Sequence, residues 1–162
     1  MKKVILALAI LLVCSAAFAQ EKKLYDPNAD GAKDIEAAIK KAAAENKFVL
    51  IQAGGNWCSW CLEFERFCKA DTKIDSVINN SFVLYHLNYS KENRNKELFA
   101  KYGYPQRFGF PAFIILNERG ERIHTQNSVY LEDGSKSYTR EKVQEFLEMW
   151  APRALNPKMY GD

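Results

Sequence analysis

Residues 54–64 read GGNWCSWCLEF and place two cysteines, Cys58 and Cys61, three positions apart. The glycine pair ends an apolar run at residues 48–51, and such a run is typical of a strand that is buried on both faces. Apolar side chains then recur at helical spacing over residues 59–70. The stretch therefore predicts a buried strand that turns directly into a helix, with the first cysteine at the helix start.

This predicted helix start decides the chemistry expected of the two thiols. There the Cys58 sulfur faces unpaired backbone N–H groups and the positive end of the helix dipole, which favour the thiolate. A thiolate is the attacking species in disulfide exchange. Cys61 lies one turn later on the same side and is expected to be more buried. We therefore interpret Cys58 as a nucleophile and Cys61 as a resolving thiol, with Trp57 and Trp60 as an apolar lip for a partner polypeptide.

Other interpretations of the cysteine pair stay open at this stage. A purely structural disulfide would close a very short loop and gain little from it. A zinc site usually has four ligands, but Cys68, His86 and His124 lack finger-like spacing, whereas copper would need the pair and one histidine. We interpret Cys68 as a small buried hydrophobic residue about 10 Å along the helix from Cys61. The histidines are expected to be core or surface residues, and neither a metal nor a cofactor is expected.

The amino terminus has the pattern of a bacterial export signal. Two lysines at positions 2–3 precede an apolar run at residues 4–13, and an Ala-x-Ala triplet follows at residues 17–19. The apolar run is too short to span a bilayer comfortably. We therefore expect cleavage near Ala19/Gln20 and a location in the periplasm.

Length and composition predict one globular domain. Residues 1–19 are interpreted as the signal peptide, residues 20–29 as an amino-terminal extension, and residues 30–162 as the domain. The chain has 23 basic and 20 acidic residues, a balance that argues against nucleic-acid binding. Its four cysteines, one of them inside the predicted signal peptide, are too few for a disulfide-dense scaffold. An exported Cys-x-x-Cys pair in such a domain is therefore expected to carry chemistry.

The remaining patterns predict an α/β sandwich around a mixed sheet, in the order α-β-α-α-β-α-β-β-α. Strands separated by helices imply a parallel portion, and a turn before the last strand implies an antiparallel hairpin. The further helices are predicted at residues 30–46, 72–78 (capped by Thr72), 92–102 and from Thr139 onward, and the further strands at 81–87, 111–116 and 122–126.

A second feature precedes the predicted strand at residues 111–116. The triplet Gly109-Phe110-Pro111 puts a proline at the first strand residue, where proline is tolerated. A cis Phe110–Pro111 bond would turn the backbone of Phe110 toward the cysteines and offer hydrogen-bonding groups to an extended substrate chain. Without the cysteines, an ordinary trans proline would be the default interpretation.

Two stretches, FVLIQAGGNWCSWC at residues 48–61 and KYGYPQRFGFPAFIILNERGERI at residues 101–123, together resemble the thioredoxin family. The resemblance covers roughly residues 30–151 and rests on the order and separation of the two motifs. It implies a thioredoxin fold, the same roles for the two cysteines, and Pro111 as the cis-proline. The WCxWC version is most similar to exported bacterial thiol-disulfide isomerases or interchange proteins.

The sequence departs from the family pattern at several positions. Where the family has a buried acid, six residues before the first cysteine, this chain has Gln52, which cannot accept a proton from Cys61. Glu63 and Glu65 are candidate substitutes, although a solvated helix face is the plainer interpretation of both. The Ser-Trp pair between the cysteines matches neither reducing thioredoxins nor strong oxidants. The segment 105–107 is interpreted as an insertion that would shape substrate choice.

We therefore predict an exported thiol-disulfide oxidoreductase, a reductase or isomerase, that acts on protein disulfides. The Cys58 thiolate would attack the substrate, and Cys61 would release the product as the Cys58–Cys61 disulfide closes. The expected partners are protein disulfide substrates and an inner-membrane thiol electron donor, and the protein is expected to be a monomer. The alternatives are a binding module for copper delivery or cytochrome maturation, and a non-catalytic chaperone that uses the Trp57 and Trp60 lip.

Overall fold

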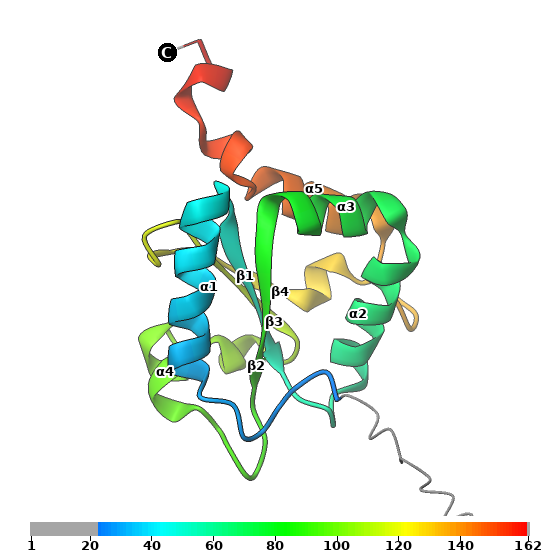
Figure 1. The fold of residues 1–162 in the computed structure, drawn as a ribbon. Coiled ribbons are helices and arrows are strands. Elements are labelled where there is room, and N and C mark those ends of the chain that lie inside the picture. The colour runs from blue at the N-terminus through cyan, green and yellow to red at the C-terminus, as the bar shows by residue number, and fades with distance from the viewer. Residues whose placement is uncertain (1–22, 162) are drawn as a thin grey trace, which may run out of the picture.

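The structure is a computed structural model that describes residues 23–161, so the predicted signal peptide lies outside the described residues. Within this range the helices and strands follow in the predicted order (Figure 1). They are α1 (Gly31–Glu45), β1 (Phe48–Gly54), α2 (Ser59–Ala70), α3 (Thr72–Ser81), β2 (Phe82–Asn88), α4 (Lys96–Lys101), β3 (Ala112–Leu116), β4 (Arg122–Asn127) and α5 (Arg140–Met149), with 3₁₀ helices η1 (Pro105–Phe108), η2 (Ser128–Leu131), η3 (Pro152–Leu155) and η4 (Pro157–Met159). None of the helices in this range has the length and apolar character needed to cross a membrane.

The strands of the described range form one mixed sheet in the order β2-β1-β3-β4. β1 runs parallel to β2 and antiparallel to β3, and β3 forms the predicted antiparallel hairpin with β4. Helices α1 and α4 cover one face of the sheet, whereas α2, α3 and α5 cover the other (Figure 1). The predicted α/β sandwich around a mixed sheet is therefore confirmed.

The central strand β1 sends alternate side chains into two cores. Phe48 and Leu50 join the core beneath α2, α3 and α5, and Val49 and Ile51 join the core beneath α1. All residues of β1 are buried, as predicted for a strand that is covered on both faces. By the same alternation, Gln52 points toward the face that carries α2.

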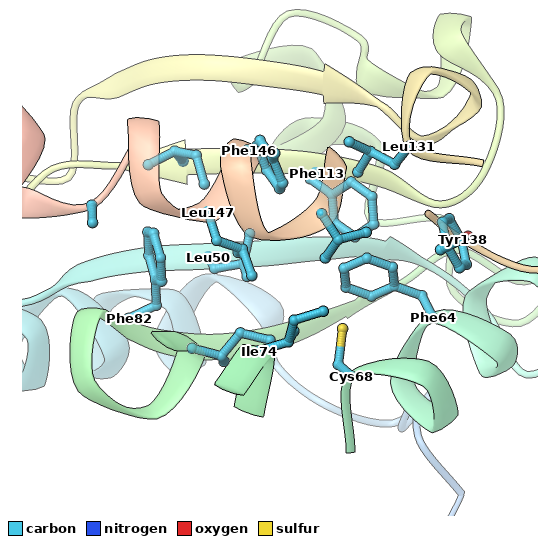
Figure 2. Close-up of a cluster of buried hydrophobic side chains, with 14 of the residues drawn as sticks. Leu50, Phe64, Cys68, Ile74, Phe82, Phe113, Leu131, Tyr138, Phe146 and Leu147 are labelled. Carbon is cyan, nitrogen blue, oxygen red and sulfur yellow. The ribbon is translucent and has the colours of Figure 1, made fainter. Parts of the chain in front are cut away.

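The core beneath α2, α3 and α5 holds the cysteine-bearing helix against the sheet. Figure 2 shows Phe64 of α2, Phe113 of β3 and Phe146 of α5 in this core. The ring centroids of Phe64 and Phe113 lie 4.4 Å apart, and those of Phe113 and Phe146 lie 5.7 Å apart. Cys68 lies in the same core with an exposed fraction of 3%. Its predicted character as a small buried hydrophobic residue is confirmed.

The amino-terminal cap of α3 is Asp71, so the predicted capping role of Thr72 is wrong. The Asp71 carboxylate accepts hydrogen bonds from the backbone N–H groups of Lys73 (2.9 Å) and Ile74 (3.2 Å). It also forms an ion pair with Arg140. A negative charge is favoured at a helix amino terminus, so the helix begins at the carboxylate, and Thr72 becomes its first helical residue.

The predicted helix at residues 92–102 is shorter in the structure, because α4 begins only at Lys96. The side-chain amide of Asn88 donates to the carbonyl oxygen of Asn93 (2.9 Å), and that of Asn95 donates to the carbonyl oxygen of Asn88 (2.8 Å). Asparagine side chains that bind backbone groups in this way compete with helix formation. They hold the segment before α4 as a loop.

Thr139 immediately precedes α5, as predicted, but it does not cap the helix with its side chain. Its hydroxyl donates instead to the carbonyl oxygen of Glu132 at 3.3 Å. The hydroxyl therefore stabilises the segment between η2 and α5, which packs on α2 near the cysteines.

Replacing Phe113 with alanine is expected to show that the aromatic core governs stability. Phe113 is fully buried, and its truncation should lower the free energy of unfolding by about 3–5 kcal/mol. The control Val129→Ala, at a side chain that is 60% exposed, should change the free energy by less than about 0.5 kcal/mol. Urea denaturation measures both, and equal small losses in the two variants would contradict the expectation.

Candidate functional site

The two cysteines lie at the start of α2, at the end of a short turn from β1. Cys58 is the residue that caps the helix, and its N–H donates to the carbonyl oxygen of Gly55 at 3.0 Å. Cys58 and Cys61 form a disulfide with an S–S distance of 2.11 Å and a Cα–Cα distance of 5.2 Å. The backbone N–H of Cys61 points at the Cys58 sulfur, 3.1 Å away. The predicted position of Cys58 at the helix start is therefore confirmed.

The two cysteines differ in exposure as the sequence predicts. Cys58 retains an exposed fraction of 5%, whereas Cys61 is fully buried. A partner sulfur that approaches from solvent therefore meets Cys58 first. The N–H of Cys61 and the amino-terminal end of α2 both favour negative charge on that sulfur once the disulfide is reduced.

The loop before β3 lies beside the cysteines. The peptide bond between Phe110 and Pro111 is cis. The Phe110 side chain packs against the cluster that contains both cysteines, and its ring meets the rings of Trp57 (5.4 Å between centroids) and Tyr89 (5.0 Å). The structure thus brings together the two sequence motifs, which are about fifty residues apart along the chain.

The two tryptophans have different surroundings. Trp57 is 59% exposed, and its indole N–H donates to the carbonyl oxygen of Tyr89 at 2.7 Å. Trp60 is half-buried, and its ring meets the edge of the Tyr138 ring at 5.4 Å between centroids. The Tyr138 hydroxyl also donates to the Trp60 carbonyl oxygen at 3.0 Å. Trp57 therefore forms the exposed aromatic edge of the site together with the half-buried Phe110, and Trp60 packs on the other side against Tyr138.

Behind the disulfide lies Gln52, which is fully buried. Its side-chain amide N–H₂ group donates to the hydroxyl oxygen of Tyr25 at 2.8 Å and to the carbonyl oxygen of Cys61 at 2.9 Å. The amide oxygen of Gln52 has no hydrogen-bond partner among the described residues. The position therefore presents hydrogen-bond donors to its neighbours, whereas a carboxylate at the same place would present acceptors.

Tyr25 is a site residue that the sequence analysis missed. It precedes α1, in the segment interpreted as an extension, yet it is fully buried and packs against both Cys58 and Cys61. Two hydrogen bonds anchor it to the turn before α2: its N–H donates to Asn56 Oδ1 at 3.1 Å, and Asn56 Nδ2 donates to its carbonyl oxygen at 2.7 Å. The available signal was the apolar pair Leu24-Tyr25 within an otherwise polar segment.

The carboxylates after the cysteine pair are both engaged, so the expectation of a solvated helix face is wrong for them. Glu63 accepts hydrogen bonds from Arg66 and from the Ser137 hydroxyl, and these donors hold the pKa of Glu63 below its usual value. Glu65 lies with Oε2 3.5 Å from Nε2 of His86, and this neighbour holds the pKa of Glu65 below its usual value. Both carboxylates are half-buried.

The other candidate residues pack against neighbours other than the disulfide. Cys68 is a free thiol, and burial raises the pKa of Cys68 well above its usual value. His124 stacks on Trp150 with 4.0 Å between ring centroids, and His86 meets the edge of the Tyr25 ring at 5.4 Å. No group of three or more histidine, cysteine, aspartate or glutamate side chains is arranged for a metal ion between residues 23 and 161.

Comparisons with known proteins bear on the fold and the chemistry. A family model described as Thioredoxin-like matches residues 30–118. Over 95 residues the chain is 25% identical to the thiol:disulfide interchange protein DsbD of Colwellia psychrerythraea, an alignment that covers 58% of this chain and 15% of that protein. The chain thus spans only a small part of that curated relative.

Two solved structures extend over most of this chain. The disulphide isomerase from Xylella fastidiosa Temecula1 has a TM-score of 0.67 at 25% identity, and the alignment covers 76% of this chain and 93% of that one. The reduced carboxy-terminal domain of DsbD from Neisseria meningitidis has a TM-score of 0.55 at 18% identity, with 74% and 96% covered. The expectation of a thioredoxin fold is therefore confirmed.

Replacing Gly54 with alanine is expected to disturb the packing behind the disulfide. A Cβ atom at this position would lie 2.4 Å from the Cys61 sulfur and 2.9 Å from the Tyr25 hydroxyl oxygen. Such overlap forces the neighbours apart, so the oxidised variant should lose about 1–3 kcal/mol of unfolding free energy. Guanidinium denaturation measures this loss, and an unchanged midpoint would show that the space between Cys61 and Tyr25 is not tightly filled.

Proposed function

This chain belongs to the Thioredoxin-like family, and on that basis we propose that it is a thiol-disulfide oxidoreductase that acts on protein disulfides. The observation that carries the proposal is the Cys58–Cys61 disulfide at the start of α2, in which Cys58 keeps an exposed fraction of 5% and Cys61 is fully buried. The two relatives at 25% identity, a thiol:disulfide interchange protein and a disulphide isomerase, support the same class of reaction.

The proposed reaction begins with the reduced protein. The Cys58 thiolate attacks one sulfur of the substrate disulfide, a bond forms between Cys58 and that sulfur, and the other substrate sulfur leaves as a thiolate that takes a proton from water. Cys61 then attacks the Cys58 sulfur, and the second substrate sulfur leaves with the proton that Cys61 gives up. The substrate gains two electrons, and the cysteine pair loses two as it closes its disulfide.

The surface around Cys58 supports binding of a polypeptide. The exposed Trp57 meets the ring of the half-buried Phe110, whose side chain packs against the cluster that contains both cysteines, and Pro111 follows it through a cis peptide bond. On the other side, Trp60 borders a pocket of about 400 Å³ that is also lined by Lys136. We assign Trp57, Trp60, Phe110 and Pro111 to substrate binding, with an extended chain lying across the Cys58 sulfur.

We also propose a compartment and an electron source for the protein. The charged, apolar and Ala-x-Ala pattern of residues 1–19 supports export to the periplasm. A protein that reduces or isomerises disulfides there must be re-reduced after each net reduction, so a thiol donor at the inner membrane is the proposed electron source. Reductase or isomerase work is preferred because the Ser-Trp pair does not match strong oxidants, and the working unit is proposed to be a monomer.

Substitution of the individual cysteines tests the proposed roles. The reduced wild-type protein is expected to reduce insulin disulfides with a thiol reductant present, and Cys58→Ser should lower turnover to the uncatalysed rate, because the attacking sulfur is lost. Cys61→Ser should still attack and then accumulate a mixed disulfide at Cys58, visible by mass spectrometry. Turbidity of the insulin chains reports turnover.

The control for these variants is Cys68→Ala, which removes a buried thiol outside the disulfide and should preserve turnover. If Cys58→Ser kept wild-type turnover, the proposed mechanism would be excluded. Loss of turnover in the control, with the fold intact by circular dichroism, would give Cys68 a role that the proposal denies.

A further inference from the structure

We propose that the Tyr25 hydroxyl, oriented by Gln52, donates a hydrogen bond to the Cys61 sulfur in the reduced protein and so makes Cys61 a better resolving thiol. The inference rests on the proposed function for its meaning, because a resolving thiol matters only in disulfide exchange. The hydrogen bond itself is tested by a measurement that does not depend on activity.

The orientation of the Gln52 side chain is determined by its neighbours. The carbonyl oxygen of Cys61 can only accept hydrogen bonds, so the amide group of Gln52 that faces it, 2.9 Å away, must be the N–H₂ group. The second hydrogen of this group points at the Tyr25 hydroxyl oxygen, 2.8 Å away. The hydroxyl oxygen of Tyr25 is therefore an acceptor in this contact.

The hydrogen of the Tyr25 hydroxyl is consequently available to another acceptor. Within the described residues, the only hydrogen bond of this hydroxyl is the one that it accepts from Gln52. Burial raises the pKa of Tyr25 far above its usual value, so the hydroxyl keeps its hydrogen at every physiological pH. A hydroxyl that accepts one hydrogen bond is also a stronger donor of the next.

The Cys61 sulfur borders the same small space as this hydroxyl. Both atoms lie around the position that a Cβ atom of residue 54 would occupy: an added Cβ there would lie 2.4 Å from the Cys61 sulfur and 2.9 Å from the Tyr25 hydroxyl oxygen. The absence of a side chain at Gly54 lets both groups border this space. Tyr25 also belongs to the buried cluster that contains both cysteines.

The remaining titratable groups around this cluster come from three elements. α2 contributes Cys58 and Glu65, β2 contributes His86, and the segment before α5 contributes Tyr138. The Glu65 charge disfavours a nearby thiolate, and the Tyr138 hydroxyl is committed to the carbonyl oxygen of Trp60. Burial and the Glu65 charge both disfavour a thiolate at Cys61, and a hydrogen bond from the neutral Tyr25 hydroxyl would offset their effect.

A hydrogen bond from Tyr25 to the Cys61 thiolate would change the rate at which Cys61 attacks the mixed disulfide. A hydrogen bond to a thiolate lowers the thiol pKa, which raises the reactive fraction but weakens the nucleophilicity of each thiolate. With a Brønsted coefficient near 0.5, a pKa lowered by about one unit gives a net gain of about three-fold below the pKa and a loss of about three-fold above it. Without the hydroxyl, attack by Cys61 should be slower than in the wild-type protein at low pH and faster at high pH. Plots of the two rates against pH should therefore cross.

The test compares the wild-type protein with Tyr25→Phe, which keeps the ring and removes only the hydroxyl. The Cys61 pKa is measured in the reduced proteins by NMR titration of ¹³Cβ-labelled cysteine. It should rise by at least about one unit in the variant, the size expected for a lost hydrogen bond to a charged group. The matched control is Tyr102→Phe, which removes a buried hydroxyl elsewhere and should leave the Cys61 pKa unchanged.

A kinetic measurement provides the second readout. The mixed disulfide of Cys58 with thionitrobenzoate is formed at acidic pH with dithiobis(nitrobenzoate), and a jump to higher pH starts the attack by Cys61. Release of thionitrobenzoate should be about three-fold slower in Tyr25→Phe below the two pKa values and about three-fold faster above them. A merely loosened site would slow release across the whole range.

Should Tyr25→Phe fail to fold, 3-fluorotyrosine at position 25 gives a shift of opposite sign. Its more acidic hydroxyl is a stronger donor and should lower the Cys61 pKa. An unchanged Cys61 pKa in the folded Tyr25→Phe or fluorotyrosine protein overturns the inference. A wild-type protein that does not form the mixed disulfide would instead overturn the proposed function, while the NMR titration would still decide whether the hydrogen bond exists.

Discussion

The hydrogen bond from the Gln52 amide to the Cys61 carbonyl oxygen ties the central strand to the helix that carries both cysteines. β1 is held by a parallel neighbour on one side and an antiparallel neighbour on the other, so its end is a rigid reference point. Both partners of the bond are fully buried, where an unpaired amide or carbonyl group is costly. This contact, together with the packing of Phe64 on Phe113, therefore fixes the position of the disulfide relative to the sheet.

At the end of β1, the backbone of Gly54 packs closely against Cys61 and Tyr25. The Cys61 sulfur and the Tyr25 hydroxyl both border the space that a side chain at Gly54 would fill, and the Asn56 side chain anchors the Tyr25 backbone through two hydrogen bonds. Residues before the first helix thereby become part of the floor of the site. The polar side chains behind the disulfide, Gln52 and Tyr25, are neutral, and His86, the partner of Glu65, meets the edge of the Tyr25 ring.

Sequence patterns predicted most of the fold because they depend on local burial and periodicity. The continuous apolar run in β1 and the helical spacing after Cys58 each have one reasonable structural solution. The errors occur at helix starts, where side chains form hydrogen bonds to the backbone. Asp71 rather than Thr72 caps α3. Side-chain hydrogen bonds of Asn88 and Asn95 delay the start of α4 to Lys96. Periodicity does not register such local hydrogen bonds, so element boundaries were less predictable than element order.

By itself the sequence determined the spacing of Cys58 and Cys61, their place at a strand-to-helix junction, and the glutamine in place of a buried acid. A helix start and a strand end are recognised from neighbouring residues. The expected reactivity of a cysteine between them can therefore be inferred from the local sequence. Only the tertiary structure decided that Tyr25 lies beside Cys61 and that Gln52 donates rather than accepts. Those facts depend on contacts between segments far apart in the chain, which are selected by packing and by the pairing of buried polar groups.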